Sequence, residues 1–304
     1  MTLAVVVNPA SRRARSALEA VRRVAAEVGF GEPVVHETAV EHTGARQARQ
    51  CVADGAVRVV VIGGDGTTRA VAHGLAGTGL ALGIVPAGTA NLYAHNLRLP
   101  TRDLTAAARV AVTAPVHDAD LGIARCRGVD GAWREDHPFL VMAGIGHDAA
   151  TVAATSEEVK ARVGWLAYFV PAARSALRRP QAVHVALDDG PARPLRAWSV
   201  ISANCGIVRA GIVIAHAARH DDGRLDVMEV TVRRPDQWVP IAAKGVLRLR
   251  GEVPGLRHEQ AREVTVLVDE GTLPVQLDGD VVAQATGVRS RVEPDALRVA
   301  ATVA

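Results

Sequence analysis

The chain has 304 residues, 49% of them hydrophobic and only 3% aromatic, and a formal net charge of +3 at pH 7. This length exceeds that of most single domains, so we expect two domains whose cores are built from aliphatic side chains. The charge is far from the concentrated basic surface of nucleic-acid-binding proteins, and we therefore expect no nucleic-acid partner. An anionic membrane surface is compatible with this charge.

Cysteine usage and the start of the chain bear on the compartment. Cys51, Cys126 and Cys205 are widely spaced and odd in number, which argues against a disulfide framework and favours a reducing compartment. The chain enters an apolar strand at Thr2 without a charged leader, so no signal peptide is expected. No apolar run reaches about 18 residues, which predicts no transmembrane segment. We expect a cytoplasmic protein.

Residues 1–122 alternate between apolar strands and helical segments. The predicted strands are 2–7, 34–35, 57–62 and 80–85, and the predicted helices are 18–28, 44–53 and 69–76. Continuously apolar strands that alternate with helices indicate a parallel sheet covered on both faces, a Rossmann-like α/β domain. Ligands of such sheets bind beyond the carboxyl ends of the strands, where Asn8 and Gly88-Thr89 are expected to gather.

Residues 123–292 are dominated by strands. The predicted strands are 138–143, 182–187, 198–204, 225–232, 264–268, 273–277 and 288–292, and two helices are predicted at 157–177 and 237–249. Turn residues between consecutive strands favour a β-rich antiparallel sandwich or barrel as the second domain. A last strand, 297–303, fits either domain, so residues 293–304 can return to the first one.

A glycine-rich turn, Gly63 to Thr67, joins the strand 57–62 to a helix. Glycines let the backbone approach a ligand closely, and the amide groups freed at a helix start point towards a bound anion. Asp65 is better suited to hold a metal ion than to bind phosphate itself. This pattern predicts a metal-nucleotide site, and a plain turn between strand and helix is the alternative.

Seven motifs follow one another along nearly the whole chain. They are Asn8-Pro9, Gly63 to Thr67, Gly83 to Asn91, Asp120-Leu121-Gly122, Gly146-His147-Asp148-Ala149, Asp222 to Val227 and Asp278-Gly279-Asp280. Together they resemble the diacylglycerol kinase catalytic-domain family, which includes bacterial diacylglycerol kinases and sphingosine kinases. The glycine turn alone is shared with NAD kinases and phosphofructokinases, so the order and spacing of the other six motifs carry the resemblance.

The resemblance implies transfer of the γ-phosphoryl group of ATP to a lipid hydroxyl, with Mg²⁺ as the metal ion. The acceptor that it implies most directly is diacylglycerol, and the product is then phosphatidic acid. It implies an enzyme that meets its lipid peripherally at a membrane surface, and it leaves a homodimer open. The residues implied to line the ATP site are Asn8, Thr38, Gly63, Gly64, Asp65, Gly66, Thr67, Gly88 and Thr89.

The implied catalytic base is Asp280, which stands where the family has the glutamate of an Asp-Gly-Glu motif. Its side chain is one methylene shorter, so its reach falls by about 1.5 Å. A misplacement of about 1 Å can cost about 10²-fold in rate, so either the backbone compensates or the enzyme is slow. A hairpin-turn carboxylate is the alternative interpretation of Asp280.

Two Mg²⁺ sites follow from the resemblance. Asp65 and Asp120 are the candidates for the catalytic ion, with a solvated strand-end carboxylate as the alternative for Asp120. A structural ion is implied at the carboxylate of Asp222 with the carbonyl groups of Leu225 and Val227. A plain Asp-Gly turn is the alternative for this second site.

Several positions depart from the family pattern. Arg69-Ala70 replaces an Asn-Glu pair, which removes a carboxylate and adds a cation beside the predicted phosphates, and Arg12 replaces a glycine. A kinase of a soluble substrate, similar to NAD kinase, and a non-catalytic nucleotide or lipid sensor therefore stay open. The apolar stripe of the predicted helix 157–177 fits either a membrane interface or a buried core.

Overall fold

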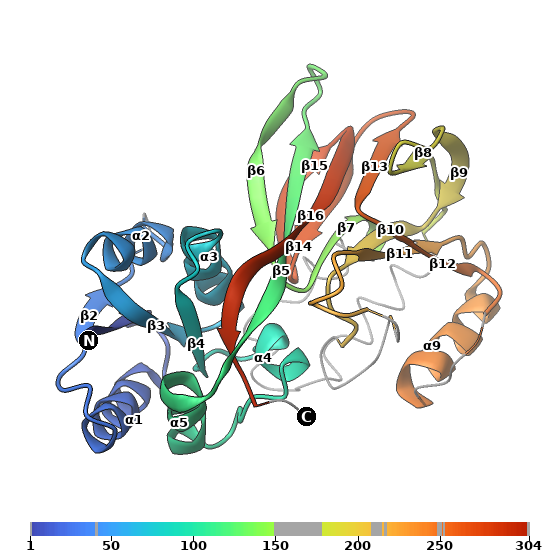
Figure 1. Cartoon of the computed structure of the whole chain (residues 1–304). Coiled ribbons are helices and arrows are strands. Elements are labelled where there is room, and N and C mark those ends of the chain that lie inside the picture. Colours follow the sequence, from blue (N-terminus) through green and yellow to red (C-terminus); the bar gives the residue numbers. More distant parts are fainter. Residues whose placement is uncertain are drawn as a thin grey trace. The chain divides into compact units, whose positions relative to one another are not determined.

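The computed structural model describes residues 2–39, 42–148, 178–207, 215, 218–247, 251 and 253–302. The chain divides into two compact units, Met1–Leu121 with Glu293–Ala304, and Gly122–Val292 (Figure 1). Over the described ranges, no helix has both the length and the apolarity that crossing a membrane requires. The predicted helix 157–177 lies outside the described residues.

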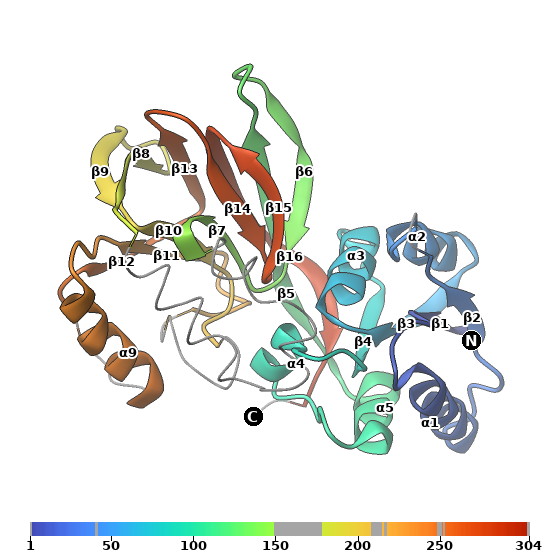
Figure 2. The ribbon, with the colours of Figure 1, turned by 180° about the vertical axis from the view of Figure 1, so that it is seen from behind.

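The first unit is built on a parallel sheet. Its strand order is β2 (Val34–Glu37), β1 (Thr2–Val7), β3 (Ala56–Gly63), β4 (Ala81–Pro86) and then the end of β16 (Gly287–Ala300). Helices α1 (Ala14–Glu27) and α5 (Leu104–Thr113) lie on one face of the sheet and α2 (Ala45–Ala53) and α3 (Asp65–Leu75) on the other (Figure 2). The prediction of a parallel α/β domain is confirmed.

Burial explains why these segments form these elements. Strand β1 is buried from Leu3 to Val7, and β3 from Val59 to Gly63, because helices cover both faces of the sheet. Helix α1 instead buries one stripe, with Ala17, Val21 and Val24 at helical spacing. Its small alanines allow the helix to pack closely on the sheet. The short helix α4 (Leu92–Asn96) follows β4.

The second unit consists of two sheets around a common apolar core. One sheet has the order β12 (Leu256–Ala261), β11 (Leu225–Val230), β10 (Ser199–Ala203), β7 (Met142–Gly146), β14 (Leu273–Leu277) and β15 (Asp280–Ala285). The other joins β16 to β13 (Glu263–Val268), β8 (Gln181–Leu187) and β9 (Arg193–Ala197), with β5 (Val116–Arg127) paired to β16 and to β6 (Trp133–Phe139). The segment η3 (Pro235–Gln237) leads into α9 (Trp238–Leu247).

The core of the second unit is aliphatic, as the composition indicates. Val183, Val227, Val266 and Val275 belong to one buried cluster to which both sheets contribute. The pairings β10 with β7 and β14 with β15 are antiparallel. The antiparallel sandwich prediction is therefore confirmed.

Two predicted strands differ from the observed ones. The predicted strand 138–143 is two strands, β6 and β7, separated at Leu140 and Val141, because the amides of these two residues donate to the carboxylate of Asp278. The predicted strands 288–292 and 297–303 are instead parts of one strand, β16, which runs from Gly287 to Ala300. Residues of β16 therefore belong to both units.

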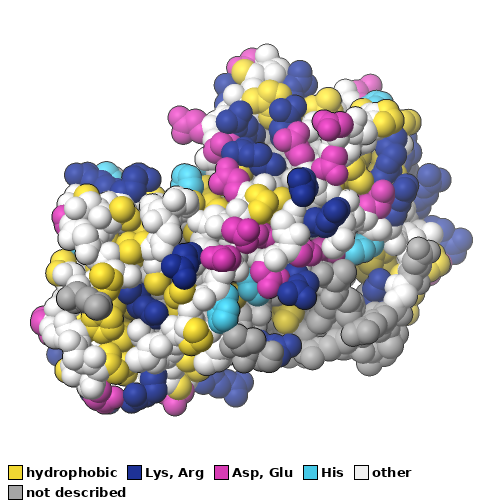
Figure 3. All heavy atoms as spheres, in the orientation of Figure 1, with side chains coloured by type: hydrophobic (Ala, Val, Ile, Leu, Met, Phe, Trp, Pro, Cys, Tyr) yellow, Lys and Arg dark blue, Asp and Glu magenta, His cyan; other side chains and the backbone are white. Residues whose placement is uncertain are grey.

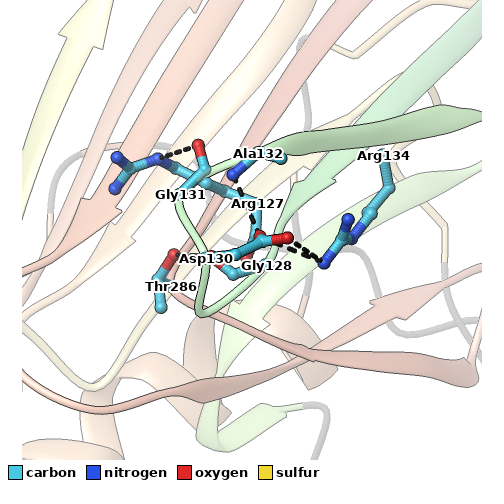
Figure 4. A network of polar contacts seen from close by, with 7 residues as sticks. All are labelled: Arg127, Gly128, Asp130, Gly131, Ala132, Arg134 and Thr286. Carbon is cyan, nitrogen blue, oxygen red and sulfur yellow. Dashed lines mark hydrogen bonds and ion pairs between the residues drawn. The ribbon is translucent and has the colours of Figure 1, made fainter.

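The turn between β5 and β6 is held by side-chain hydrogen bonds (Figure 4). Asp130 accepts a bond from Ala132 N at 3.1 Å and pairs with Arg134 at 3.0 Å. Thr286 Oγ1 donates to the carbonyl of Gly128 at 2.9 Å and so connects the turn to the residue that precedes β16.

Basic and acidic side chains are interspersed on the face of the molecule in Figure 3.

Candidate functional site

The carboxyl ends of four parallel strands lie side by side at one edge of the first sheet. Three backbone hydrogen bonds continue the pairing past the strand ends, from Thr38 N to Val7 O (2.9 Å), from Asn8 N to Ile62 O (2.9 Å) and from Ala87 N to Gly63 O (2.8 Å). The structure therefore brings together the segments that carry the predicted nucleotide-binding residues. This edge is where ligands of parallel sheets bind.

Helix α3 begins at this edge. Gly63 ends β3, Gly64 is the N-cap residue with an extended backbone (φ −93°, ψ −168°), and Asp65 is the first helical residue. The first amide groups of a helix have no partner within the helix, and they carry a partial positive charge. An anion held at Gly64 to Thr67 would receive hydrogen bonds from these groups.

Two predicted residues from different elements share a hydrogen bond. Asn8 Nδ2, after β1, donates to Thr67 Oγ1 in α3 at 3.2 Å. Asn8 Oδ1 accepts from Ala10 N at 3.0 Å, which fixes the orientation of the side-chain amide. Thr67 is buried, so the contact holds the start of α3 against the end of β1.

The loop after β4 is tied to the glycine turn. Asn91, in the left-handed region at φ 48°, donates to Gly88 O at 2.8 Å and accepts from Gly88 N at 3.0 Å. A Cβ atom on Gly88 would lie 2.5 Å from the Cα of Gly64, so only glycine permits this approach. Asp65 Oδ1 accepts from Leu92 N at 2.5 Å. The two glycine loops therefore form one connected structure.

Thr89 is exposed beside this loop, whereas Asp120 is deeply buried. Asp120 lies within β5, has 0% of its surface exposed, and accepts from the backbone amide of Asp295 at 3.0 Å. The alternative of a solvated strand-end carboxylate is therefore wrong for Asp120. Its assignment as a metal ligand stays a prediction.

Oxygen donors of the kind that Mg²⁺ takes are present in the first unit. The described part of the chain contains no group of three or more His, Cys, Asp and Glu side chains that could hold a metal ion. Asp65 and Asp120 supply two carboxylates, which suits an ion that retains several waters and takes one or two carboxylates. Mg²⁺ binding at Asp65 and Asp120 stays a prediction.

In the second unit, Asp278-Gly279 forms the turn of the β14–β15 hairpin. Leu277 pairs with Asp280, and the two residues between them have φ of 51° and 90°. Positive φ at both central positions, with the sequence Asp-Gly, is typical of a type I′ turn. Asp280 is the first residue of β15 and is exposed. It follows the turn rather than lying within it.

Asp278 is the structural carboxylate of this motif. Only 5% of its surface is exposed, and its two oxygens accept hydrogen bonds from three consecutive backbone amides, those of Leu140 (3.0 Å), Val141 (2.8 Å) and Met142 (3.0 Å). Hydrogen bonds to an ionised acceptor are stronger than those between neutral groups. The hairpin is thereby attached to the start of β7.

Asp148 lies at the end of β7 and is bound by two other strands. Ser199 Oγ of β10 donates to Asp148 Oδ1, and Gln276 Nε2 of β14 donates to Asp148 Oδ2 at 3.2 Å. The neighbouring His147 packs its ring against that of Trp198, with 5.7 Å between the centroids. Burial lowers the pKa of His147, so the ring is neutral near pH 7 and donates from Nε2 to the carbonyl of Arg179.

Two family models match this chain. The model described as "Diacylglycerol kinase catalytic domain" matches residues 2–124. The model described as "YegS C-terminal NAD kinase beta sandwich-like domain" matches residues 140–301. The chain belongs to the diacylglycerol kinase family, in its YegS-like form.

Curated relatives of the chain agree with this family assignment. A "Probable lipid kinase YegS-like" of Pseudomonas aeruginosa strain UCBPP-PA14 is 34% identical over 292 residues, which cover 91% of this chain and 87% of the relative. A "Diacylglycerol kinase" of Mycobacterium tuberculosis strain H37Rv is 30% identical over 256 residues, 82% of this chain and 78% of the relative. An uncharacterized Synechocystis protein is 32% identical over 131 residues, 43% of this chain and 28% of its own length.

Solved structures share the fold. The crystal structure of a putative diacylglycerol kinase from Bacillus anthracis superposes with a TM-score of 0.77 at 21% identity and covers 99% of this chain and 97% of that one. Yeast NADH kinase, solved with NADH, superposes with a TM-score of 0.51 at 11% identity over 100% of this chain and 84% of that one. At such identities the likeness concerns the fold and not the substrate.

The residues of the second predicted metal site lie at the start of β11. Asp222 is exposed and accepts from Arg224 N at 3.0 Å, and Gly223 has a φ of 67°. Leu225 and Val227 follow in β11 and are buried. The structure therefore shows the expected turn, and ion binding at Asp222, Leu225 and Val227 stays a prediction.

The departures from the family pattern lie at the start of α1 and in α3. Arg12 is exposed, and the neighbouring Arg13 donates to the carbonyls of Thr101 and Arg102 at 2.7 and 2.8 Å. Arg13 thus secures a loop of the first unit. Arg69 lies in the first two turns of α3 and is partly exposed.

Three residues of the site were missed by sequence reasoning. Asn91, Ser199 and Gln276 each bind a residue of a motif through the side chain. Asn91 stands within the motif Gly83 to Asn91, and its left-handed backbone is a conformation in which asparagine is enriched. Gln276 is a polar residue in an otherwise apolar strand, and this was the available signal for it.

Proposed function

We propose that this protein transfers the γ-phosphoryl group of ATP to a lipid hydroxyl, and that diacylglycerol is the acceptor and phosphatidic acid the product. One observation carries the proposal: the two glycine loops meet at the carboxyl edge of the parallel sheet, where Gly64 and Gly88 touch and α3 begins. Backbone amides at the start of a helix suit nucleotide phosphates. Membership of the lipid kinase family supports the acceptor class.

Each residue of the edge has a proposed role towards ATP. Amides at Gly64 to Thr67 donate to phosphate oxygens, and the hydroxyls of Thr38, Thr67 and Thr89 are further donors. Asn8 holds the α3 start through Thr67. Mg²⁺, held by Asp65 and Asp120 directly or through water, would supply charge neutralisation on the phosphates. The structural ion at Asp222, Leu225 and Val227 is proposed to stabilise the start of β11.

Asp280 is the proposed general base. Its carboxylate takes the proton of the lipid hydroxyl while the hydroxyl oxygen bonds to the γ-phosphorus, and the bond between that phosphorus and the β,γ-bridging oxygen breaks to release ADP. The side chain is exposed at the start of β15 and therefore accessible to a substrate.

The decisive experiment incubates purified protein with radiolabelled ATP, Mg²⁺ and mixed micelles of one lipid, followed by thin-layer detection of labelled lipid. We expect labelled phosphatidic acid with diacylglycerol. Absence of product from diacylglycerol, sphingoid bases and phosphatidylglycerol alike would overturn the lipid kinase proposal. Labelled product from NAD without lipid would assign a soluble substrate, and ATP binding in calorimetry without turnover would assign a sensor.

Two variants test Asp280. Asp280→Asn should lose turnover and keep ATP binding, because the proposed ATP residues come from the first unit. Asp280→Glu restores the length found in the family and should keep or raise turnover. Full activity in Asp280→Asn would remove Asp280 from the mechanism.

The proposed location is cytoplasmic with peripheral attachment to a membrane, because the lipid acceptor resides there. Sedimentation with vesicles of phosphatidylglycerol and diacylglycerol should carry the protein into the pellet at low salt. Equal partition into the supernatant with and without vesicles would contradict peripheral attachment. Light scattering on the eluting protein would decide between a monomer and the homodimer left open by the sequence.

A further inference from the structure

Gln276 connects the turn before Asp280 to Asp148. It lies in β14 with 2% of its surface exposed. Its Oε1 accepts from the backbone amide of Gly279 at 2.8 Å, and its Nε2 donates to Asp148 Oδ2 at 3.2 Å. Gly279 immediately precedes Asp280, so one side chain binds both the hairpin and the carboxylate at the end of β7.

The orientation of this side-chain amide is set by its two partners. A backbone N–H only donates, and the ionised carboxylate of Asp148 only accepts. Oε1 must therefore face Gly279, and Nε2 must face Asp148. Burying a side-chain amide costs free energy unless both its ends are hydrogen-bonded. Gln276 is the one polar residue of β14, and its neighbours in the strand are apolar. The two bonds are the reason that a polar side chain is tolerated here.

The receiving end of the connection is itself fixed. Asp148 Oδ1 is bound by the hydroxyl of Ser199, and Gly144 of β7 pairs with Gln276 across the sheet. A Cβ atom on Gly144 would lie 2.1 Å from Asp148 Oδ2 and 2.9 Å from Gln276 Nε2. Position 144 therefore has to be a glycine for the Gln276–Asp148 contact to exist.

The hairpin has a second attachment that acts on its other central residue. The carboxylate of Asp278 binds the amides of Leu140, Val141 and Met142, whereas Gln276 binds the amide of Gly279. Both residues of the turn are thus held by side-chain hydrogen bonds to β14 or to the start of β7. The position of the next residue, Asp280, is therefore determined by the attachments of Asp278 and Gly279.

We propose that Gln276 is a positioning residue that sets the place of the Asp280 carboxylate, an inference that rests on the proposed role of Asp280 as general base. Gln276 does not touch the reacting atoms and acts through the Gly279 amide. Accurate placement matters here because Asp280 is one methylene shorter than the glutamate that it replaces. A displacement of about 1 Å is enough to cost about 10²-fold in rate.

The first test is Gln276→Leu, which keeps the approximate volume and removes both hydrogen bonds. We expect kcat to fall about 10²-fold while KM for ATP stays unchanged. Gln284→Leu is the matched control, because Gln284 is exposed on the neighbouring strand β15, and it should leave kcat unchanged. A wild-type kcat in a folded Gln276→Leu protein would overturn the proposal. A rise in KM for ATP by the same factor as the fall in kcat would also overturn it.

The second test exchanges donor and acceptor. Gln276→Glu keeps an acceptor for Gly279 N but sets two carboxylates against each other, so kcat should fall. In the Asp148→Asn/Gln276→Glu double variant, the new amide at position 148 donates to the new carboxylate at position 276, and kcat should recover at least tenfold over Gln276→Glu. A double variant no faster than Gln276→Glu would contradict the proposal, because the contact between positions 148 and 276 would then be restored without restoring the rate.

Failure of the proposed function is distinguishable from failure of this inference. If the wild-type protein phosphorylates no lipid, the kinase proposal fails, and hydrogen exchange at the Gly279 amide takes the place of kcat. That amide should exchange faster in Gln276→Leu than in the wild type and return towards the wild-type rate in the double variant. An unchanged exchange rate in Gln276→Leu would show that Gln276 does not hold the turn. If the wild-type protein phosphorylates lipid and only the Gln276 variants depart from the expected results, the kinase proposal holds and the positioning role of Gln276 is rejected.

Discussion

Asp278 Oδ1 accepts a hydrogen bond from the backbone amide of Val141 at 2.8 Å, although the two residues are 137 positions apart. The same carboxylate binds the amides on either side, so one buried side chain connects the β14–β15 hairpin to the start of β7. The bond explains the interruption between β6 and β7, and it places a buried carboxylate next to three backbone donors.

Asp278→Asn should lower the free energy of unfolding by about 1.5–3 kcal/mol, the range for hydrogen bonds to charged groups. Asparagine keeps the left-handed backbone but offers a single acceptor oxygen to the three amides. Urea unfolding followed by circular dichroism measures the change. Asp189→Asn, at an exposed position, is the control and should leave the midpoint unchanged. Equal midpoints for both variants would show that the buried carboxylate adds no stability.

Asn91 is predicted to shape the nucleotide loop. Asn91→Gly retains a residue that adopts positive φ and removes the two bonds to Gly88, so the Kd for ATP should rise about tenfold, equivalent to about 1.4 kcal/mol. Asn91→Ala should raise it further, because alanine also strains the backbone. Calorimetric titration with ATP and Mg²⁺ gives both values. An unchanged Kd for ATP in Asn91→Gly would show that the two bonds to Gly88 do not contribute to nucleotide binding.

Acid should destabilise the fold through His147. Burial lowers the pKa of this ring below its ordinary value of 6.5, so the unfolded chain takes up a proton before the folded one does. The stability that the neutral ring provides is present above the ordinary pKa and is lost as the pH falls from there towards the lowered one. Thermal melts between pH 7.5 and pH 5 should show a shallower decline in His147→Gln than in the wild type. Parallel curves would contradict this role.

The thiols should be inert in the folded protein. Cys51, Cys126 and Cys205 form no disulfide and are buried, and burial raises the pKa of Cys51 to about 11. The thiolate is the reactive form, so the native protein should react with dithionitrobenzoate far more slowly than a free thiol does. The full thiol content should appear after addition of guanidinium chloride. A thiol that reacts at once in the native protein would identify an exposed cysteine.

The fold class was predictable because its main signals are local. Continuous apolar runs such as β1 and β3 predict buried parallel strands, and the loss of helical pattern after residue 122 predicts an antiparallel second part. Helix α5 was not predicted. Its clearest sequence cue is Asp103, whose carboxylate accepts from the amides of Thr105 and Ala106 as an N-cap.

The site was predictable only where the residues of a motif lie together in one local loop. The glycine turns could be placed at one sheet edge because consecutive parallel strands end there. Contacts such as Gln276 with Asp148 join residues that are 128 positions apart, and they follow from strand pairing that no local pattern specifies. The burial of Asp120 depends in the same way on Asp295, at the other end of the chain.

The course of β16 has a consequence for how this protein is completed during synthesis. The part of the strand that belongs to the first unit begins at Glu293, and its Arg298 and Val299 pair with Ala81 and Leu82 of β4. The parallel sheet therefore stays one strand short until Arg298 and Val299 have been synthesised. Until then the buried carboxylate of Asp120 also lacks the amide of Asp295. The second unit ends at Val292, so a nascent chain has all residues of this unit available before its first unit can close.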